Sequence, residues 1–226
     1  NAFGKRINQI DFKEGNKGKT INLTIDTEIQ KLTSELLRDK AGSISIMDIY
    51  TGEIIAMNSS PSFDPNLFLY GIDNNLWDQI KKDPLKPLVN KTLSGLYSPG
   101  STIKPIVALS ALENDVIRAN MRVECRGKVE MYDQKYHCWK KKGHGVMSLK
   151  NAIKQSCDIY FYELARLLGV DRLNLTAEKF GLGKQVLGQY FLNEKKGIVP
   201  STKWKKENLG QNWYLGETFI TGIGQG

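Results

Sequence analysis

The feature that most constrains this chain is a turn that leads directly into an apolar run. Residues 98–105 read Ser-Pro-Gly-Ser-Thr-Ile-Lys-Pro, and residues 106–109 read Ile-Val-Ala-Leu. Because serine, proline and glycine favour turns, the stretch predicts a loop that opens a buried helix at about Ser101. Residues i and i+3 of a helix share one face, with Cβ atoms about 5–6 Å apart, so Ser101 and Lys104 are expected side by side.

A serine and a lysine in this arrangement can act as a nucleophile and its base. A serine hydroxyl is a weak nucleophile and needs a neighbouring base. A lysine can be that base only if its pKa falls well below about 10.4, which burial can achieve. The N-terminus of a helix also favours developing negative charge. Since Ser-x-x-Lys alone arises by chance in many proteins, the surrounding residues carry the prediction.

Composition and charge exclude several classes of protein. The chain has 226 residues, of which 40% are hydrophobic and 25% charged, enough for one domain or part of a larger one. It has no apolar stretch of the length that crosses a membrane. The net charge is +8 and the pI about 9.2, but no nucleic-acid motif accompanies it, so no nucleic-acid partner is expected. The basic balance suits an anionic surface, and a lysine-rich proteome explains it equally well.

Hydrophobic patterning predicts strands first and helices later, without regular βαβ alternation, which favours an α+β fold. Residues 1–19 are expected to form a linker and residues 20–226 a domain, loop-rich beyond residue 183. Strands are predicted at 20–26, 42–49 and 53–57 and around 123, 129–132 and 136, and helices at 27–37, 74–82, 101–114, 148–153, 159–168 and 171–180.

A second group of polar residues, Ser156 and Asp158, lies between two predicted helices. A serine there can relay a proton between Lys104 and a leaving group, and Asp158 can orient a lysine or a substrate amide. The alternative is structural, because either side chain can cap the helix that begins at about residue 159.

Three stretches together resemble the class B penicillin-binding proteins, and best their elongation-type branch, penicillin-binding protein 2. They are residues 97–105, Tyr-Ser-Pro-Gly-Ser-Thr-Ile-Lys-Pro; residues 156–162, Ser-Cys-Asp-Ile-Tyr-Phe-Tyr; and residues 221–226, Thr-Gly-Ile-Gly-Gln-Gly. Ser-x-x-Lys followed by Ser-x-Asn or Ser-x-Asp is typical of penicillin-recognising serine enzymes. The resemblance covers nearly the whole chain.

The resemblance implies a penicillin-binding transpeptidase fold, similar to serine β-lactamases, with an antiparallel sheet flanked by helices and a mainly helical subdomain. It implies that Ser101 is the acylated nucleophile, Lys104 its base, and Ser156 with Asp158 the second motif, where the family usually has Asn in place of Asp158. The implied reaction is D,D-transpeptidation of peptidoglycan stem peptides, inhibited by β-lactams and needing no cofactor. A location at the periplasmic face of the inner membrane, an anchor outside this chain and a partner glycosyltransferase of the elongation complex are also implied.

The family's third motif, Lys-Thr-Gly or Lys-Ser-Gly, does not occur in the chain. We therefore expect a C-terminally truncated domain that lacks its last strands, which leaves the activity of the chain alone open. Two alternatives remain. One is a relative that hydrolyses or senses β-lactams, and the other is a non-catalytic scaffold of the cell-wall elongation complex.

All three cysteines and one histidine surround the second motif in sequence: Cys125, Cys138, His144 and Cys157. Three thiolates and one imidazole make a good tetrahedral set for a structural zinc. Lys140, Lys141 and Lys142 would favour the thiolate form. The alternatives are a Cys125–Cys138 disulfide with Cys157 free, or three buried thiols, and His137 is a substitute ligand.

Overall fold

The structure, a computed structural model, describes residues 15–131, 134–188 and 190–226. The chain forms two compact units, residues 1–87 (unit 1) and residues 88–226 (unit 2). The predicted linker, residues 1–19, lies largely outside the described residues, and its described part, 15–19, is exposed and without regular structure.

Unit 1 is a helix packed on a β-hairpin. The helix α1 (Thr27–Leu36) begins where the Asp26 carboxylate accepts hydrogen bonds from two backbone N–H groups. The strands β1 (Gly42–Met47) and β2 (Ile54–Ser60) pair antiparallel, as predicted. Gln30 joins the helix to the hairpin, because its side-chain amide exchanges two hydrogen bonds of 2.9 Å with the backbone of Met57.

The prediction of a strand at residues 20–26 is wrong. These residues have no regular structure. Thr24 Oγ1 and Asp26 N each donate one hydrogen bond to the backbone of β2, and these two bonds do not form the regular ladder of a paired strand. Two further elements follow the hairpin, the 3-10 helix η1 (Pro65–Phe68) and the helix α2 (Asn74–Lys82), which has the predicted bounds.

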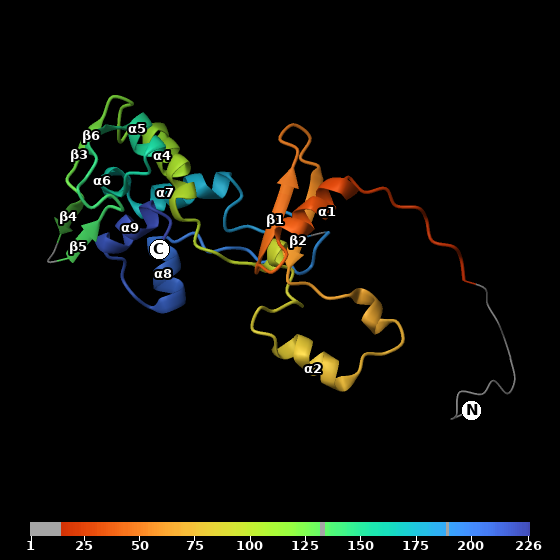
Figure 1. The fold of residues 1–226 in the computed structure, drawn as a ribbon. Helices are drawn as coiled ribbons and strands as arrows, with labels where there is room; N and C mark the ends of the chain where they lie inside the picture. Colours follow the sequence, from red (N-terminus) through yellow and green to blue (C-terminus); the bar gives the residue numbers. More distant parts are fainter. Residues whose placement is uncertain (1–14, 132–133, 189) are drawn as a thin grey trace, which may run out of the picture. The chain divides into compact units, whose positions relative to one another are not determined.

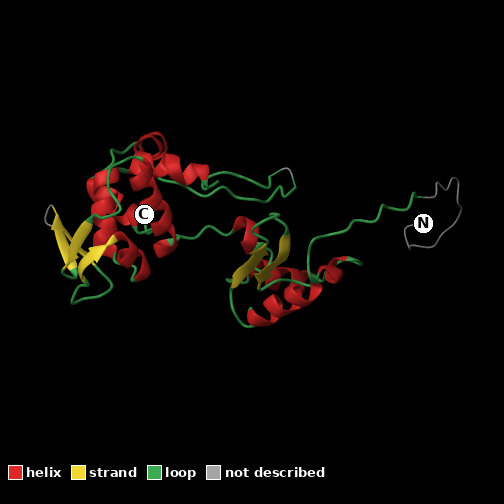
Figure 2. Cartoon of the chain, turned by 90° about the horizontal axis from the view of Figure 1, so that it is seen from above, coloured by secondary structure: helices red, strands yellow, loops and turns green. Residues whose placement is uncertain are grey.

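Unit 2 is mainly helical and contains the core. Its strands form two short antiparallel sheets, β3 with β6 and β4 with β5, and Figure 2 shows them at one side of the helices. The elements in chain order are α3 (Lys91–Ser94), η2 (Gly100–Ile103), α4 (Lys104–Glu113), β3 (Arg122–Cys125), β4 (Lys128–Met131), β5 (Gln134–His137), β6 (Gly145–Ser148), α5 (Leu149–Lys154), α6 (Asp158–Leu168), α7 (Val170–Lys179), α8 (Thr202–Leu209) and α9 (Leu215–Gly222).

The helix α6 forms the centre of unit 2. It packs against α4, α7, α9 and β3, and Figure 1 shows it inside the unit. Its aromatic residues Tyr160 and Phe161 are fully buried, as is Val107 of α4. Burying such side chains contributes roughly 1.5–3 kcal/mol each, so the α4–α6 contact holds the two predicted motifs in one core.

The predicted mixture of helices and antiparallel strands is confirmed, but four elements of unit 2 were missed. They are α3 and β6, where no element was predicted, and α8 and α9, where a loop was expected. The helix predicted from Ser101 begins as the 3-10 turn η2 and becomes α-helical at Lys104. Across the described residues, no helix combines the length and the apolar character needed to traverse a bilayer.

Candidate active site

The turn that holds Ser101 is fixed by a contact with the C-terminal glycines. Gly100 N donates a hydrogen bond of 2.9 Å to Gly224 O. Gly224 has φ +73°, and a Cβ on it would lie 2.2 Å from Gly100 O. Only glycine fits there, so the segment 221–226 supports the backbone beside Ser101.

Lys104 is buried directly below this turn, with 2% of its side chain exposed. Its Nζ donates to Asp158 Oδ1 at 2.7 Å, to Ser156 Oγ at 2.9 Å and to Ser156 O at 3.2 Å. An ammonium group has three donors, so these three acceptors satisfy it fully. The ring of Phe161 lies 5.5 Å away and adds a cation–π contact.

The Ser156 hydroxyl joins Lys104 to Ser101. Ser156 Oγ lies 2.8 Å from Ser101 Oγ and donates to it, while it accepts from Lys104. The three polar groups therefore form one continuous hydrogen-bonded chain from a buried amine to an exposed hydroxyl. An ammonium cannot accept a proton, so the reverse transfer, from Ser101 through Ser156 to Lys104, requires Lys104 in its neutral amine form.

Asp158 is the first residue of α6, but it does not cap that helix. The N-cap is Cys157, and no side chain caps the helix start. Instead Asp158 Oδ1 accepts from Lys104, and its Oδ2 accepts from Trp139 N at 3.0 Å. The capping alternative for Ser156 and Asp158 is therefore not what the structure contains.

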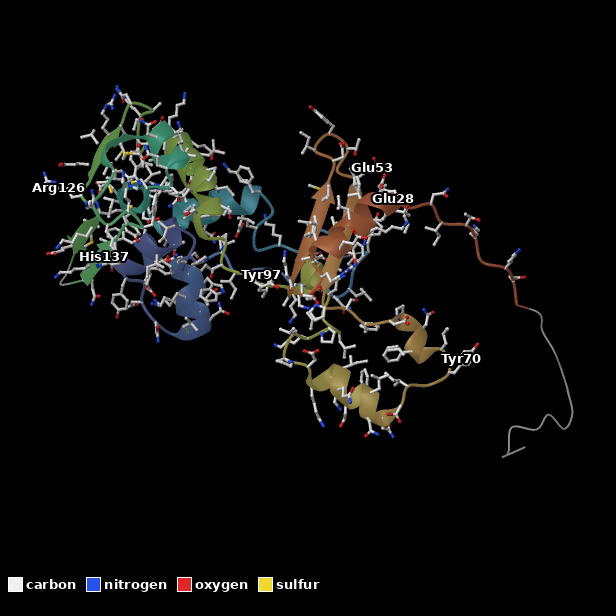
Figure 3. The ribbon with its side chains drawn as sticks, in the orientation of Figure 1. Glu28, Glu53, Tyr70, Tyr97, Arg126 and His137 are labelled. Atoms are coloured by element: carbon white, nitrogen blue, oxygen red, sulfur yellow. The ribbon has the colours of Figure 1, made fainter. Side chains whose placement is uncertain are left out.

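The four predicted metal ligands also come together, next to the second motif. One ligand atom from each of Cys125, Cys138, His144 and Cys157 lies within 4.8 Å of the others. His144 Nδ1 is 3.5 Å from the sulfur atoms of both Cys125 and Cys138. All three thiols are free and buried, so the alternative, a Cys125–Cys138 disulfide, is not formed. His137 is exposed, on the strand side of unit 2 (Figure 3).

Burial is the largest cause of the pKa shifts in this cluster. It raises the pKa of Cys157 to about 12 and raises the pKa of Cys138. It also lowers the pKa of His144, with a further contribution from Lys140. Desolvation of the thiols is the largest cause of both cysteine shifts, and the expected charge of the neighbouring lysines is not among the causes.

Sequence reasoning missed two contributors to the site. Trp139 binds the loop that carries Ser156, and Phe161 faces the Lys104 amine. No pattern identified either residue, because a tryptophan after a cysteine and a phenylalanine in an apolar helix both resemble ordinary packing residues.

The fold and these side chains match the motif pattern of the penicillin-recognising serine enzymes. The family profile described as the penicillin binding protein transpeptidase domain matches residues 42–225. The chain therefore belongs to the penicillin-binding protein transpeptidase family, in its PBP2/MrdA-type class B branch.

Proteins of known identity are similar to this chain over 90% or more of its length. The peptidoglycan D,D-transpeptidase MrdA of Escherichia coli K12 is 36% identical over 228 residues, which cover 100% of this chain and 36% of that protein. PBP2 of Pseudomonas aeruginosa, solved in complex with WCK 5153, is 42% identical with a TM-score of 0.85, covering 90% of this chain and 45% of that one.

PBP2 of Helicobacter pylori, solved in complex with MreC, is 33% identical with a TM-score of 0.87, covering 100% of this chain and 42% of that one. The chain spans about a third of the length of the curated relatives it matches.

Proposed function

We propose that the protein carrying this chain is a peptidoglycan D,D-transpeptidase with Ser101 as its nucleophile. The observation that carries the proposal is the hydrogen-bonded chain Lys104–Ser156–Ser101, which joins an exposed hydroxyl to a buried amine. Relatives over the full chain bear the name peptidoglycan D,D-transpeptidase, which supports the same substrate class.

In the proposed reaction Ser101 attacks the penultimate D-alanine carbonyl of a stem peptide. Ser101 Oγ forms a bond to the carbonyl carbon, and its proton passes through the Ser156 hydroxyl to Lys104 in its amine form. When the tetrahedral intermediate collapses, the C–N bond breaks and the terminal D-alanine leaves with a proton returned by the same path. An amine of a neighbouring stem then attacks the acyl carbon: the new C–N bond forms, the bond from that carbon to Ser101 Oγ breaks, and a proton from the amine passes to Ser101 Oγ.

Asp158 keeps Lys104 in place through both steps, since it holds the amine at 2.7 Å while the Ser156 hydroxyl exchanges protons. A β-lactam presents a similar carbonyl to the same serine, so it is expected to acylate Ser101. The first alternative, a β-lactam-hydrolysing or -sensing relative, differs from the proposal in what happens after acylation. The second, a non-catalytic scaffold, differs in that it is not acylated.

The test is a cross-linking assay with the full-length protein and peptidoglycan carrying pentapeptide stems. We expect D-alanine release and cross-linked dimers, both lost in Ser101→Ala and retained in Ser34→Ala, which changes an exposed serine of unit 1. Hydrolysis of penicillin without cross-linking would favour the hydrolytic relative. No cross-linking and no reaction with penicillin would favour the scaffold.

We also propose that the cluster of Cys125, Cys138, His144 and Cys157 holds a structural zinc. Zinc–sulfur bonds of about 2.3 Å and zinc–nitrogen bonds of about 2.0–2.1 Å give a tetrahedron with a sulfur–nitrogen edge of about 3.5 Å. The distances from His144 Nδ1 to two of the sulfur atoms, 3.5 Å each, fit this edge. The lowered pKa of His144 favours the neutral imidazole that binds metals.

Bound zinc would link four segments: the end of β3, residue 138, the residue before β6, and the start of α6 beside Ser156 and Asp158. We expect one zinc per protein by elemental analysis. His144→Ala should lose it, and His137→Ala, which changes the only other histidine, should keep it. Full zinc content in His144→Ala would contradict this assignment.

We propose finally that both compact units belong to one transpeptidase domain, because the family match runs through both. The proposed location is the periplasmic face of the bacterial inner membrane, where peptidoglycan is assembled. The proposed partners are stem peptides, β-lactams and a glycosyltransferase of the elongation complex. The H. pylori relative was solved in complex with MreC, which supports the proposal that this protein also binds partner proteins.

A further inference from the structure

Ser156 has a backbone conformation that needs external support. Its φ is +49°, in the left-handed region that serine seldom adopts. The other described non-glycine residues with positive φ are Asp39, Lys86 and Asp115, all exposed. Such a conformation is strained and persists only where neighbouring groups hold it. In Ser156 it aims the hydroxyl at both Ser101 and Lys104.

Two donors hold the carbonyl of this residue. Lys104 Nζ donates to Ser156 O at 3.2 Å, and the indole nitrogen of Trp139 donates to the same oxygen at 3.0 Å. Trp139 Nε1 also lies 3.0 Å from Gln155 O, so one N–H group is shared by two successive carbonyls. The indole therefore binds the carbonyl groups on both sides of the Ser156 Cα.

Trp139 contacts the second motif through both its backbone and its side chain. Its backbone N–H donates to Asp158 Oδ2, while its indole binds Ser156 O. The side chain itself is 64% exposed, so burial of the ring does not account for its position. Its ring approaches His144 edge-on, with centroids 5.2 Å apart, a contact that a phenylalanine ring could also make. The N–H group is what distinguishes tryptophan here.

We propose that Trp139 is a positioning residue for acyl transfer. Its indole N–H holds the carbonyl of Ser156, which keeps the strained backbone in the conformation that places the Ser156 hydroxyl between Lys104 and Ser101. Trp139 exchanges no proton and acts only through Ser156. This inference rests on the proposed acylation of Ser101.

The test measures acylation of the full-length protein by a fluorescent penicillin, as the limiting acylation rate and the apparent dissociation constant. Trp139→Phe keeps the ring and removes the donor. Because the loss of this hydrogen bond lets the backbone of Ser156 relax, we expect the limiting rate to fall about tenfold while the dissociation constant stays unchanged. The matched control is Trp213→Phe, which removes an indole hydrogen bond to Thr218 and should change neither quantity.

A double-mutant cycle separates positioning from general structural support. If Trp139 acts through Ser156, then adding Trp139→Phe to Ser156→Ala should slow acylation less than twofold further. An equal tenfold loss in both backgrounds would overturn the proposal, and so would an unchanged rate in Trp139→Phe. If Trp139→Phe does not fold, hydrogen exchange of the indole N–H in the unsubstituted protein decides, and exchange as fast as in free indole overturns it.

These outcomes are distinct from failure of the proposed function. An unsubstituted protein that is not acylated at all overturns both inferences. Normal acylation of the unsubstituted protein with normal acylation of Trp139→Phe overturns only the role of Trp139.

Discussion

At the scale of single residues, the site depends on a buried cation that is fully hydrogen-bonded. Lys104 is surrounded by the carboxylate of Asp158, the hydroxyl and carbonyl of Ser156 and the ring of Phe161. Removing one partner of a buried ion pair is costly because the other charge stays buried and uncompensated. The charge of Asp158 should therefore matter to folding as well as to chemistry.

Replacing Asp158 with asparagine should destabilise the protein. Asparagine keeps an acceptor for Lys104 but removes the negative charge, so we expect a loss of about 3 kcal/mol in the free energy of unfolding, measured by urea denaturation. Glu124→Gln serves as the control, because its pair with Arg126 is exposed and should contribute nothing measurable. Equal stability of Asp158→Asn and the unsubstituted protein would show that the pair is not held as described.

Tyr162 should make stability fall at high pH. Burial, assisted by the charge of Asp158, raises the pKa of Tyr162 from 10.0 to about 12. Between these values the unfolded chain loses the phenolic proton and the folded one keeps it, so the stabilisation is complete below pH 10 and is lost as pH rises towards 12. Unfolding measured against pH should lose this slope in Tyr162→Phe and keep it in Tyr190→Phe, which changes an exposed tyrosine. The same slope in both variants would contradict the assignment.

Much of the site was predictable because its residues occur in a specific order. Ser101, Lys104, Ser156 and Asp158 were named from two short motifs, and the structure joins all four by hydrogen bonds. Trp139 was not predictable, since its indole binds a carbonyl 17 residues away, and only the folded loop creates that contact.

At the scale of elements, α9 shows why pattern reasoning failed beyond residue 183. The helix has eight residues with glycine at both 216 and 222, and glycine lowers helix propensity by about 1 kcal/mol. Packing of α9 against α6 compensates for this low helix propensity. The packing is so close that a Cβ on Gly222 would lie 2.4 Å from the Cβ of Ala165 in α6. The glycine that weakens the local signal permits the close packing of α9 on α6.

Gly222→Ala should therefore destabilise unit 2. The added methyl group overlaps Ala165, and overpacking of this kind costs about 1–3 kcal/mol, measurable as a lower midpoint of denaturation. Gly197→Ala is the matched control, since a Cβ there meets nothing within 4 Å. A Gly222→Ala protein as stable as Gly197→Ala would mean that α9 does not approach α6 so closely.

At the scale of the whole molecule, the proposed chemistry lies entirely in unit 2. All eight predicted site residues fall between Ser101 and Asp158, within residues 88–226. The sequence predicted an α+β chain, whereas the particular fold followed from the resemblance of three motifs. Periodicity alone could not give it, because a short strand such as β6 and a short helix such as α8 carry too few apolar repeats to be recognised.

The most direct test of Ser101 as nucleophile is the intact mass of the full-length protein after incubation with benzylpenicillin, followed by peptide mapping. We predict a stable increase of one penicillin per protein, mapped to the peptide that contains Ser101 and absent from Ser101→Ala. An adduct that persists in Ser101→Ala, or the lack of any adduct on the unsubstituted protein, would contradict the assignment. An adduct that forms and is then quickly lost would indicate a β-lactam-hydrolysing enzyme instead.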